Sequence, residues 1–304
     1  MKRILLLLIA FLALQLSAQQ QPIVRQYMVN KTSFNPAFVG SDENISIALL
    51  YAHQWAGFEG APHNIFARIH APIKKGSVAL GLTIYNEQLG VHNNTNITAQ
   101  FAYRILLKKE RRIVFGVQAS VGISRENGNS LTTTFVGDDI YKQDITTTRF
   151  NAGVGVAYYS KNVWIGLAVP QLLRNQTNYA ATDNKIEAAK FNFNIAGGYN
   201  FRVKDFGLSP SFIMRHSADV KFMMDLNLNF KYKEVFWVGP FYRINTSYGL
   251  LIGVAPTKWM KIGYAGELAQ QTTLMKNNYG THEIMLGFNV VPKGSKVSQS
   301  PRYF

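Results

Sequence analysis

The chain has 304 residues, of which 47% are hydrophobic, 13% aromatic and only 16% charged, with a formal net charge of +15. A charged fraction below the ~25% of ordinary globular domains argues against disorder and against a cytosolic globule. The lack of cysteine excludes a disulfide scaffold, a thiolate nucleophile and Cys-ligated zinc. A mean hydropathy close to zero excludes a polytopic helical membrane protein, because each helical span needs ~20 consecutive apolar residues.

The N-terminal segment has the pattern of a secretory signal peptide. Lys2 and Arg3 precede an apolar run over 4–14, and the small residues Ser17 and Ala18 come before three glutamines. Because this run is too short for a permanent membrane helix, we expect residues 1–18 to be cleaved off. The alternative is an uncleaved N-terminal anchor. Export also argues against nucleic acid as a partner, despite the basic charge.

The segment from residue 19 to residue 44 precedes the alternating part of the chain. It begins with glutamines and continues with aromatic residues, an Asn-Pro pair and a glycine, which indicate an ordered, turn-rich segment. We expect it to lie in the periplasm or to plug the lumen of the barrel predicted below. Its motif residues are Tyr27, Phe34, Asn35, Pro36, Phe38 and Gly40.

From residue 45 onward, apolar and polar residues alternate with a period of two, the pattern of strands with two different faces. Most of these segments are about ten residues long, which suits tilted membrane-spanning strands, and their even number is typical of bacterial barrels. No stretch of twelve or more residues has a convincing amphipathic helical pattern. The predicted strands are 45–55, 65–72, 77–87, 95–107, 112–125, 148–160, 163–169, 191–203, 207–216, 221–232, 235–244, 247–256, 259–268 and 281–290.

The connections between these strands alternate between two sets. One set is always short, whereas the other contains all the long connections, at 56–64, 88–94, 127–147, 170–190 and 269–280. Tight periplasmic turns and longer external loops are typical of outer-membrane barrels. The sequence therefore predicts an all-β fold, an antiparallel transmembrane barrel of about 14 strands over 45–290, with both termini and a tail at 291–304 in the periplasm. The alternative is a secreted β-sandwich or propeller, whose strands are usually shorter.

Ionisable residues on the predicted inner face must be paired or solvated. Their expected role is structural, in ion pairs and hydrogen bonds to a plug, and the alternative is charge selectivity in an open pore. They are Arg68, Arg104, Arg202, Asp225, Lys231, Arg243 and Glu283.

Basic residues gather at the short turns. They are either a solvated rim or a ring that docks an acidic periplasmic partner. The residues are Lys74, Lys75, Lys108, Lys109, Arg111, Arg112, Lys161, Lys204, Lys233 and Lys258.

No motif for catalysis, metal binding or cofactor binding stands out. The six histidines lack metal-ligand spacing, and no Gly-x-Ser-x-Gly elbow occurs. A hydrolase triad of Ser46, His53 and Glu59 can be imagined without any motif behind it. We therefore expect no catalytic residue, metal or cofactor.

Several strings resemble the PorP/SprF family of outer-membrane proteins over about residues 22–290. The most specific runs from Trp55 to Pro62 (Trp-Ala-Gly-Phe-Glu-Gly-Ala-Pro), and others are Phe34 to Gly40, Asn86 to Gly90, Val169 to Leu173 and Thr281 to Leu286. The resemblance implies a non-enzymatic component of the type IX secretion and gliding-motility machinery. The partners that it implies are a secreted surface protein with a C-terminal sorting domain, such as an adhesin, and periplasmic secretion components.

The string from Trp55 to Pro62 lies in the first predicted external loop. Its glycines and proline would shape a rigid turn, and its aromatic residues resemble binding hot spots or members of an interfacial girdle. We hypothesise that it contacts the exported partner through Trp55, Gly57, Phe58, Glu59, Gly60 and Pro62. The alternatives for the whole protein are a general diffusion porin and a barrel lipid hydrolase.

Overall fold

The computed structural model describes most of the chain. The described residues are 23–42, 44–73, 76–107, 111–130, 144–173, 175–178, 185–188, 192–217, 220–270 and 278–291. The expected signal peptide, the four lysines Lys74, Lys75, Lys108 and Lys109, and the tail after residue 291 lie outside this part. No helix among the described residues is long and apolar enough to cross a membrane.

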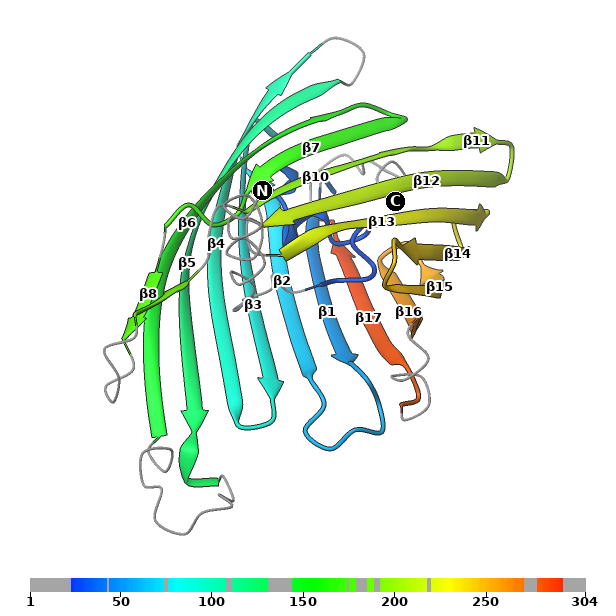
Figure 1. The fold of residues 1–304 in the computed structure, drawn as a ribbon. Coiled ribbons are helices and arrows are strands. Elements are labelled where there is room, and N and C mark those ends of the chain that lie inside the picture. Colours follow the sequence, from blue (N-terminus) through cyan, green and yellow to red (C-terminus); the bar gives the residue numbers. More distant parts are fainter. Residues whose placement is uncertain are drawn as a thin grey trace, which may run out of the picture.

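The described chain forms one large antiparallel sheet, a separate hairpin and three 3-10 turns (Figure 1). The large sheet consists of β1 (Ile45–His53), β2 (His63–Ile73), β3 (Val78–Leu89), β4 (His92–Leu106), β5 (Arg112–Asn127), β6 (Asp144–Tyr159), β7 (Val163–Val169), β10 (Asn192–Tyr199), β11 (Phe201–Val203), β12 (Phe206–Ser217), β13 (Val220–Tyr232), β14 (Phe236–Arg243), β15 (Ser247–Thr257), β16 (Met260–Ala269) and β17 (Thr281–Val290). The hairpin is β8 (Asn175–Asn178) with β9 (Lys185–Ala188), and the 3-10 turns are η1 (Lys31–Ser33), η2 (Pro36–Phe38) and η4 (Gly128–Ser130).

Two pairings close the sheet into a barrel. The first strand β1 pairs with the last strand β17 over nine residue pairs, from Ile45↔Val290 to His53↔His282. On the other side, β10 pairs with both β7 and β12, so that no gap remains in the ring of strands. Since β11 continues β10 after Asn200, the wall has fourteen strands. Closure leaves no open sheet edge in the hydrocarbon, as a membrane barrel requires.

The predicted strands agree with the observed ones in number and order, with ends that shift by a few residues. Two details were not predicted. The strand expected at 191–203 is interrupted at Asn200, and the connection at 170–190 contains the β8–β9 hairpin. The sequence from Val235 to Arg243 is apolar on both faces, yet β14 alternates cleanly between exposed and buried residues, because Trp237 and Phe241 face inward.

The outer surface has the features of a lipid-facing wall. Exposed aliphatic and phenylalanine side chains cover its middle, and aromatic residues lie nearer both ends, as in outer-membrane barrels. Tyr51, Trp55, Tyr242 and Tyr248 lie toward the end with the long loops, here called the long-loop end. Tyr103, Phe201, Phe206, Tyr232, Phe236 and Trp259 lie toward the opposite, short-turn end.

The wall has unequal heights at the long-loop end. β4, β5 and β6 have 15 or 16 residues each, whereas β14 has eight and leads through the short turn at 244–246 into β15. In Figure 1 the long strands reach beyond their neighbours toward the bottom of the view. The segments 92–96, 122–127 and 144–149 lie past the apolar belt, and apart from Gly122, Ile123 and Ile145 all their residues are polar. We call this three-stranded extension the projecting sheet.

Candidate functional site

The N-terminal segment 23–42 lies inside the barrel. Its backbone and side-chain groups bond to inward-facing side chains of strands all around the wall, including Glu283 on β17, Arg68 on β2, Gln100 on β4, Asn194 on β10 and Ser211 on β12. Nearly every residue of the segment is buried. We call residues 23–42 the plug.

Aromatic side chains form the centre of the plug. Phe34 and Phe38 pack edge-to-face at 5.8 Å, and Phe38 contacts the wall residues Trp164 at 5.7 Å and Tyr159 at 6.3 Å. Tyr27 shares a hydrogen bond with Ser211 at 3.0 Å, and its burial raises the pKa of its phenol. Buried aromatic pairs of this kind fix both the position and the orientation of a segment.

The string Asn35-Pro36-Ala37 has a local reason for its shape. Asn35 caps the 3-10 turn η2 by accepting a hydrogen bond from Ala37 N at 2.8 Å, and Pro36 occupies the first position of the turn, where no N–H is needed. The amide nitrogen of Asn35 donates to the carbonyls of Val156 and Leu167, both at 3.2 Å. One side chain therefore shapes the plug and ties it to β6 and β7.

The wall is recessed where the plug touches it. A Cβ atom on Gly116 would collide with the backbone of Pro36 and Ala37, and one on Gly155 would collide with the side chain of Asn35. Glycine at such positions allows the close approach of another backbone. Wall and plug are therefore complementary in shape.

A buried ion network joins the plug to the wall near the long-loop end. Arg25 pairs with Glu267, and the backbone N–H groups of Arg25 and Gln26 donate to Glu283 at 3.0 and 3.1 Å. Arg243 continues the network, because it bonds to Glu267 at 2.7 Å and to Asp225 at 2.7 Å. Buried charges persist only when they are paired and hydrogen-bonded, so the plug completes the electrostatics of this wall.

A second polar contact lies closer to the short-turn end. The guanidinium of Arg68 donates to Asn30 Oδ1 at 2.7 Å and to the carbonyl of Val29 at 3.1 Å. His70 accepts a hydrogen bond from Gly40 N at 3.1 Å and lies 3.5 Å from a carboxylate oxygen of Asp42. Gly40 has φ +75, a conformation that glycine adopts without strain, and it directs the chain toward β1.

Lys31 is the plug residue with the most unusual ionisation. Its ammonium donates to the carbonyl of Met28 at 2.7 Å and lies 4.8 Å from the centre of the Trp164 ring. Burial lowers the pKa of Lys31 to about 7, because the charged form loses its hydration. The charge of Lys31 therefore varies near neutral pH.

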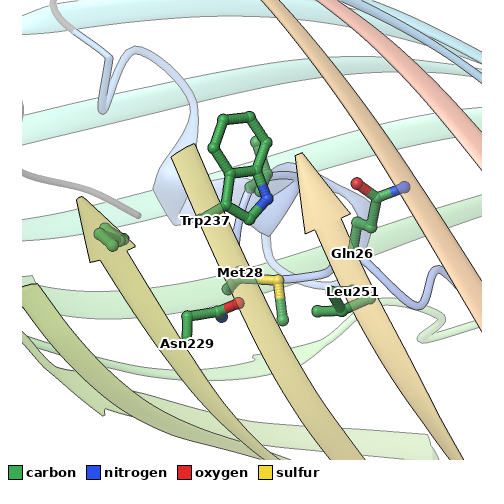
Figure 2. A pocket seen from close by; sticks show the side chains of 7 residues that line it. Gln26, Met28, Asn229, Trp237 and Leu251 are labelled. Carbon is green, nitrogen blue, oxygen red and sulfur yellow. The ribbon is translucent and has the colours of Figure 1, made fainter. Parts of the chain in front are cut away.

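A small pocket remains between plug and wall. Figure 2 shows Trp237, Leu251 and Asn229 from the wall and Gln26 and Met28 from the plug around it. Among the described residues, no group of three or more His, Asp or Glu side chains could hold a metal ion.

The loop from Gln54 to Pro62 is held on both sides by its neighbours. Ala56 N donates to the carbonyl of Gly280 at 2.8 Å, and Tyr279 N donates back to the carbonyl of Ala56 at 2.7 Å. On the other side, Gly90 N donates to the carbonyl of Gly60 at 3.1 Å. The loop is therefore a fixed lip at the long-loop end.

Exposed aromatic side chains stand on this lip. Trp55, Phe58 and Tyr279 are 41%, 38% and 81% exposed, and Glu59 is exposed beside them. Gly57 and Gly60 have φ +101 and +69, which favours glycine, while Pro62 is buried at the base. Tyr279 had no signal in the sequence, since only the fold brings it beside the loop.

The described residues of the basic turns lie together at the short-turn end. Lys161, Lys204, Lys233, Lys258 and Arg111 are exposed there. Arg112 differs, because it is half-buried and lies 5.8 Å from the centre of the Tyr159 ring. Arg202 was expected in the lumen, but it is half-exposed at this end and pairs with Glu234, because the β11–β12 hairpin extends past the neighbouring strand β7. The other expected lumen residues lie inside or half-buried against the plug.

The imagined hydrolase triad does not assemble. Ser46 and His53 lie near opposite ends of β1, seven residues apart, and a strand rises about 3.3 Å per residue. Ser46 is also buried on the inner face, whereas Glu59 is exposed on the lip. These residues cannot share one catalytic site.

Comparison with known families agrees with the family resemblance of the sequence strings in the plug and the lip. The model of the type IX secretion system membrane protein PorP/SprF matches residues 16–288, nearly the whole chain. The chain belongs to the PorP/SprF family. It is thus a type IX secretion membrane protein with the fold of an outer-membrane barrel. No curated protein matches the chain.

Solved barrels are similar to this PorP/SprF protein at low sequence identity. A Pseudomonas aeruginosa FadL homologue has 11% identity and a TM-score of 0.49, over 84% of this chain and 92% of that one. The Acinetobacter baumannii outer membrane protein Omp33 has 7% identity and a TM-score of 0.47, over 82% of this chain and 100% of that one. The outer membrane phospholipase A of Escherichia coli has 9% identity and a TM-score of 0.39, over 84% and 93%.

Proposed function

We propose that this PorP/SprF protein anchors or helps to export a cell-surface protein, such as a gliding adhesin with a C-terminal sorting domain. It would bind this protein at the long-loop end and the periplasmic secretion machinery at the short-turn end. In this orientation, both termini are periplasmic. The barrel would serve as a receptor and not as a channel.

The observation that carries this proposal is the plug. The plug occupies the lumen and is held there by buried aromatic contacts, a buried ion network and glycine recesses in the wall. A general diffusion porin needs a water-filled lumen, as larger barrels of 16–18 strands provide. The filled lumen leaves the two ends of the barrel as the surfaces for function.

The lip offers the partner site at the long-loop end. Aromatic residues are enriched at binding hot spots, because they supply a large contact area with little loss of conformational freedom. Here the backbone bonds to Gly280 and Gly90 fix the loop before any partner arrives, which lowers the entropic cost of binding. The basic residues at the short-turn end favour an acidic partner through charge complementarity.

The test uses Phe58→Ala and Tyr279→Ala in the native outer membrane. We expect each to lower retention of the surface protein by about 30-fold, which is the loss of one hot spot. The exposed Phe236→Ala, near the short-turn end, is the matched control and should retain it normally. Unchanged retention in both lip variants would show that the lip is only structural.

A conductance measurement separates the receptor from a porin. The purified full-length chain in a planar bilayer should carry no steady ion current, because the plug fills the lumen. A chain without residues 23–42 should conduct if it still inserts. A steady current through the full-length chain would contradict the receptor proposal.

A further inference from the structure

The projecting sheet ends in an open strand edge. β6 pairs with β5 along its full length, from Asn127↔Asp144 to Arg112↔Tyr159. Its pairing with β7 starts only at Val154, opposite Val169. Among the described residues, no strand pairs with 144–153 on that side, and β8 and β9 pair only with each other.

Among the described residues, the chain that follows β7 hydrogen-bonds to only the first part of this edge, and the next strand, β8, lies near β6 without pairing with it. Leu172 N donates to the carbonyl of Ala152 at 2.8 Å, and the side chain of Asn151 then binds Leu173 through both its oxygen, at 3.1 Å, and its nitrogen, at 3.0 Å. Asn151 also accepts from Ala152 N at 2.9 Å. This one side chain replaces the next rungs of the ladder, and within the described part of the chain no backbone hydrogen bond reaches this side of 144–150.

The direction of the free backbone groups follows from the bond to Ala152. In an antiparallel sheet, every second residue directs both its N–H and its C=O to the same neighbour. Since the carbonyl of Ala152 points to the β7 side, the N–H and C=O groups of Asp144, Thr146, Thr148 and Phe150 point there too. Their seven-residue span is about 23 Å long, enough for one added strand.

The edge has only some of the features that prevent strand addition. Natural edges are usually protected by charged residues (lysine above all), proline, a bulge or a cover, and the charged residues of this stretch are Asp144 and Arg149 near its two ends. The sequence Ile145-Thr-Thr-Thr-Arg149 contains neither proline nor lysine, and threonine and isoleucine favour strands. Phe150, at the membrane side of this stretch, is 64% exposed.

We propose that the edge of β6 from Asp144 to Phe150 binds an extended segment of the exported polypeptide by strand addition. An added strand would be recognised by its backbone, with β-branched and uncharged side chains preferred beside the threonines. This inference rests on the proposed function, because that function places an exported chain at the long-loop end. It adds a second contact that differs from the lip in kind, since the lip presents side chains and the edge presents backbone.

The test traps a peptide on single-cysteine variants. Trapping reports only on the introduced cysteine, because the natural chain has no cysteine. The probe is a biotinylated ten-residue peptide of alternating threonine and valine with one central cysteine, supplied as its 2-pyridyl disulfide, so that the thiolate of the variant attacks the cysteine sulfur and pyridine-2-thione leaves. Thr148→Cys on this edge should form a disulfide with the peptide at about ten times the rate of Thr95→Cys, because binding to the edge raises the local concentration of the peptide. Thr95 is the matched control, because it lies in the projecting sheet on β4 and is paired on both sides.

A proline substitution then tests the backbone itself. Thr146→Pro removes a free N–H and leaves the bonds to β5 intact, whereas Thr146→Ala changes only the side chain. In the Thr148→Cys chain, Thr146→Pro should abolish trapping and Thr146→Ala should preserve it. Equal trapping at Thr148→Cys and Thr95→Cys, or equal effects of proline and alanine, would overturn the proposal.

Two further outcomes are distinguishable. If Thr148→Cys with Thr177→Cys forms an internal disulfide on oxidation by dissolved oxygen, and excess peptide does not diminish it, β8 covers the edge and the proposal is wrong. If the lip variants lose retention of the surface protein while Thr146→Pro retains it fully, the receptor function stands and strand addition fails. If neither the lip variants nor Thr146→Pro changes retention, both proposals fail.

Discussion

Glu283 on β17 accepts a hydrogen bond from the backbone N–H of Arg25 at 3.0 Å, although the two residues are 258 positions apart in the sequence. The same carboxylate accepts from Gln26 N, so it holds two consecutive peptide groups of the plug. The guanidinium of Arg25 pairs with Glu267 and also lies 3.9 Å from a carboxylate oxygen of Glu283. The barrel thus holds the start of the plug by its backbone as well as by its charge.

Loss of this contact should loosen the plug. We expect Glu283→Ala to lower the free energy of unfolding by about 3–5 kcal/mol, because the change leaves the buried N–H groups of Arg25 and Gln26 without their acceptor and removes one of the two carboxylates that face the Arg25 guanidinium. Urea titration of the folded barrel in detergent measures this. Glu234→Ala is the control, since its pair with Arg202 is largely exposed and such pairs contribute about 0–1 kcal/mol. Equal effects of the two substitutions would contradict the role of Glu283.

The recess for the plug gives a second prediction. Gly116→Ala places a methyl group against Pro36 and Ala37, so the plug should shift or leave its seat. A cysteine introduced at Ala37, which is fully buried, should then react with a water-soluble maleimide at least about tenfold faster, as expected for a locally opened site. Gly287→Ala is the matched control, because the nearest atom to its added Cβ is a methylene of Lys261 at 3.6 Å. Slow reaction in both variants would show that the plug tolerates the methyl group.

Fold and site differ in how far the sequence could predict them. Period-two alternation, such as that from Ile113 to Ile123, predicted the strands, because lipid and lumen impose different chemistry on the two faces of each strand. The glutamine-rich start and the Asn35-Pro36 turn indicated an ordered segment before the first strand. Alternation carries no information on where that segment docks, and the contact of Arg25 with Glu283 depends on closure of the barrel.

Misplaced or missed features have physical reasons of their own. Arg202 follows the inward pattern of its strand, yet it lies past the last residue that β7 pairs with, where a charged side chain can reach water. Tyr279 precedes the last strand and has no periodic pattern around it. It became part of the lip only through its backbone bond to Ala56.

Lys31 predicts that the stability of the plug depends on pH. The pKa of this lysine is about 7 in the folded chain and about 10.5 when unfolded, so the unfolded state binds more protons between these values. Stability should therefore be lowest below pH 7 and rise by up to about 1.4 kcal/mol per pH unit toward pH 10. Lys31→Met should remove this part of the pH dependence, measured as the difference in urea unfolding between the two chains at pH 6 and pH 9. An equal change in the free energy of unfolding between pH 6 and pH 9 in the wild-type and Lys31→Met chains would contradict this role of Lys31.

The basic residues at the short-turn end give the last prediction. If they dock an acidic periplasmic partner, reversal of Lys161, Lys204, Lys233 and Lys258 to glutamate should abolish co-purification of periplasmic secretion components from the native membrane. All four are exposed in turns, so the barrel itself should fold and insert normally, which heat-modifiable gel migration checks. The amount of periplasmic components that co-purifies with the wild-type barrel should fall steeply between 50 and 500 mM salt, because the Debye length shrinks from about 14 to about 4 Å over this range. A charge-neutral change of the same four lysines to glutamine should give an intermediate loss. Undiminished recovery in the glutamate variant would mean that the lysines only keep the turns in water.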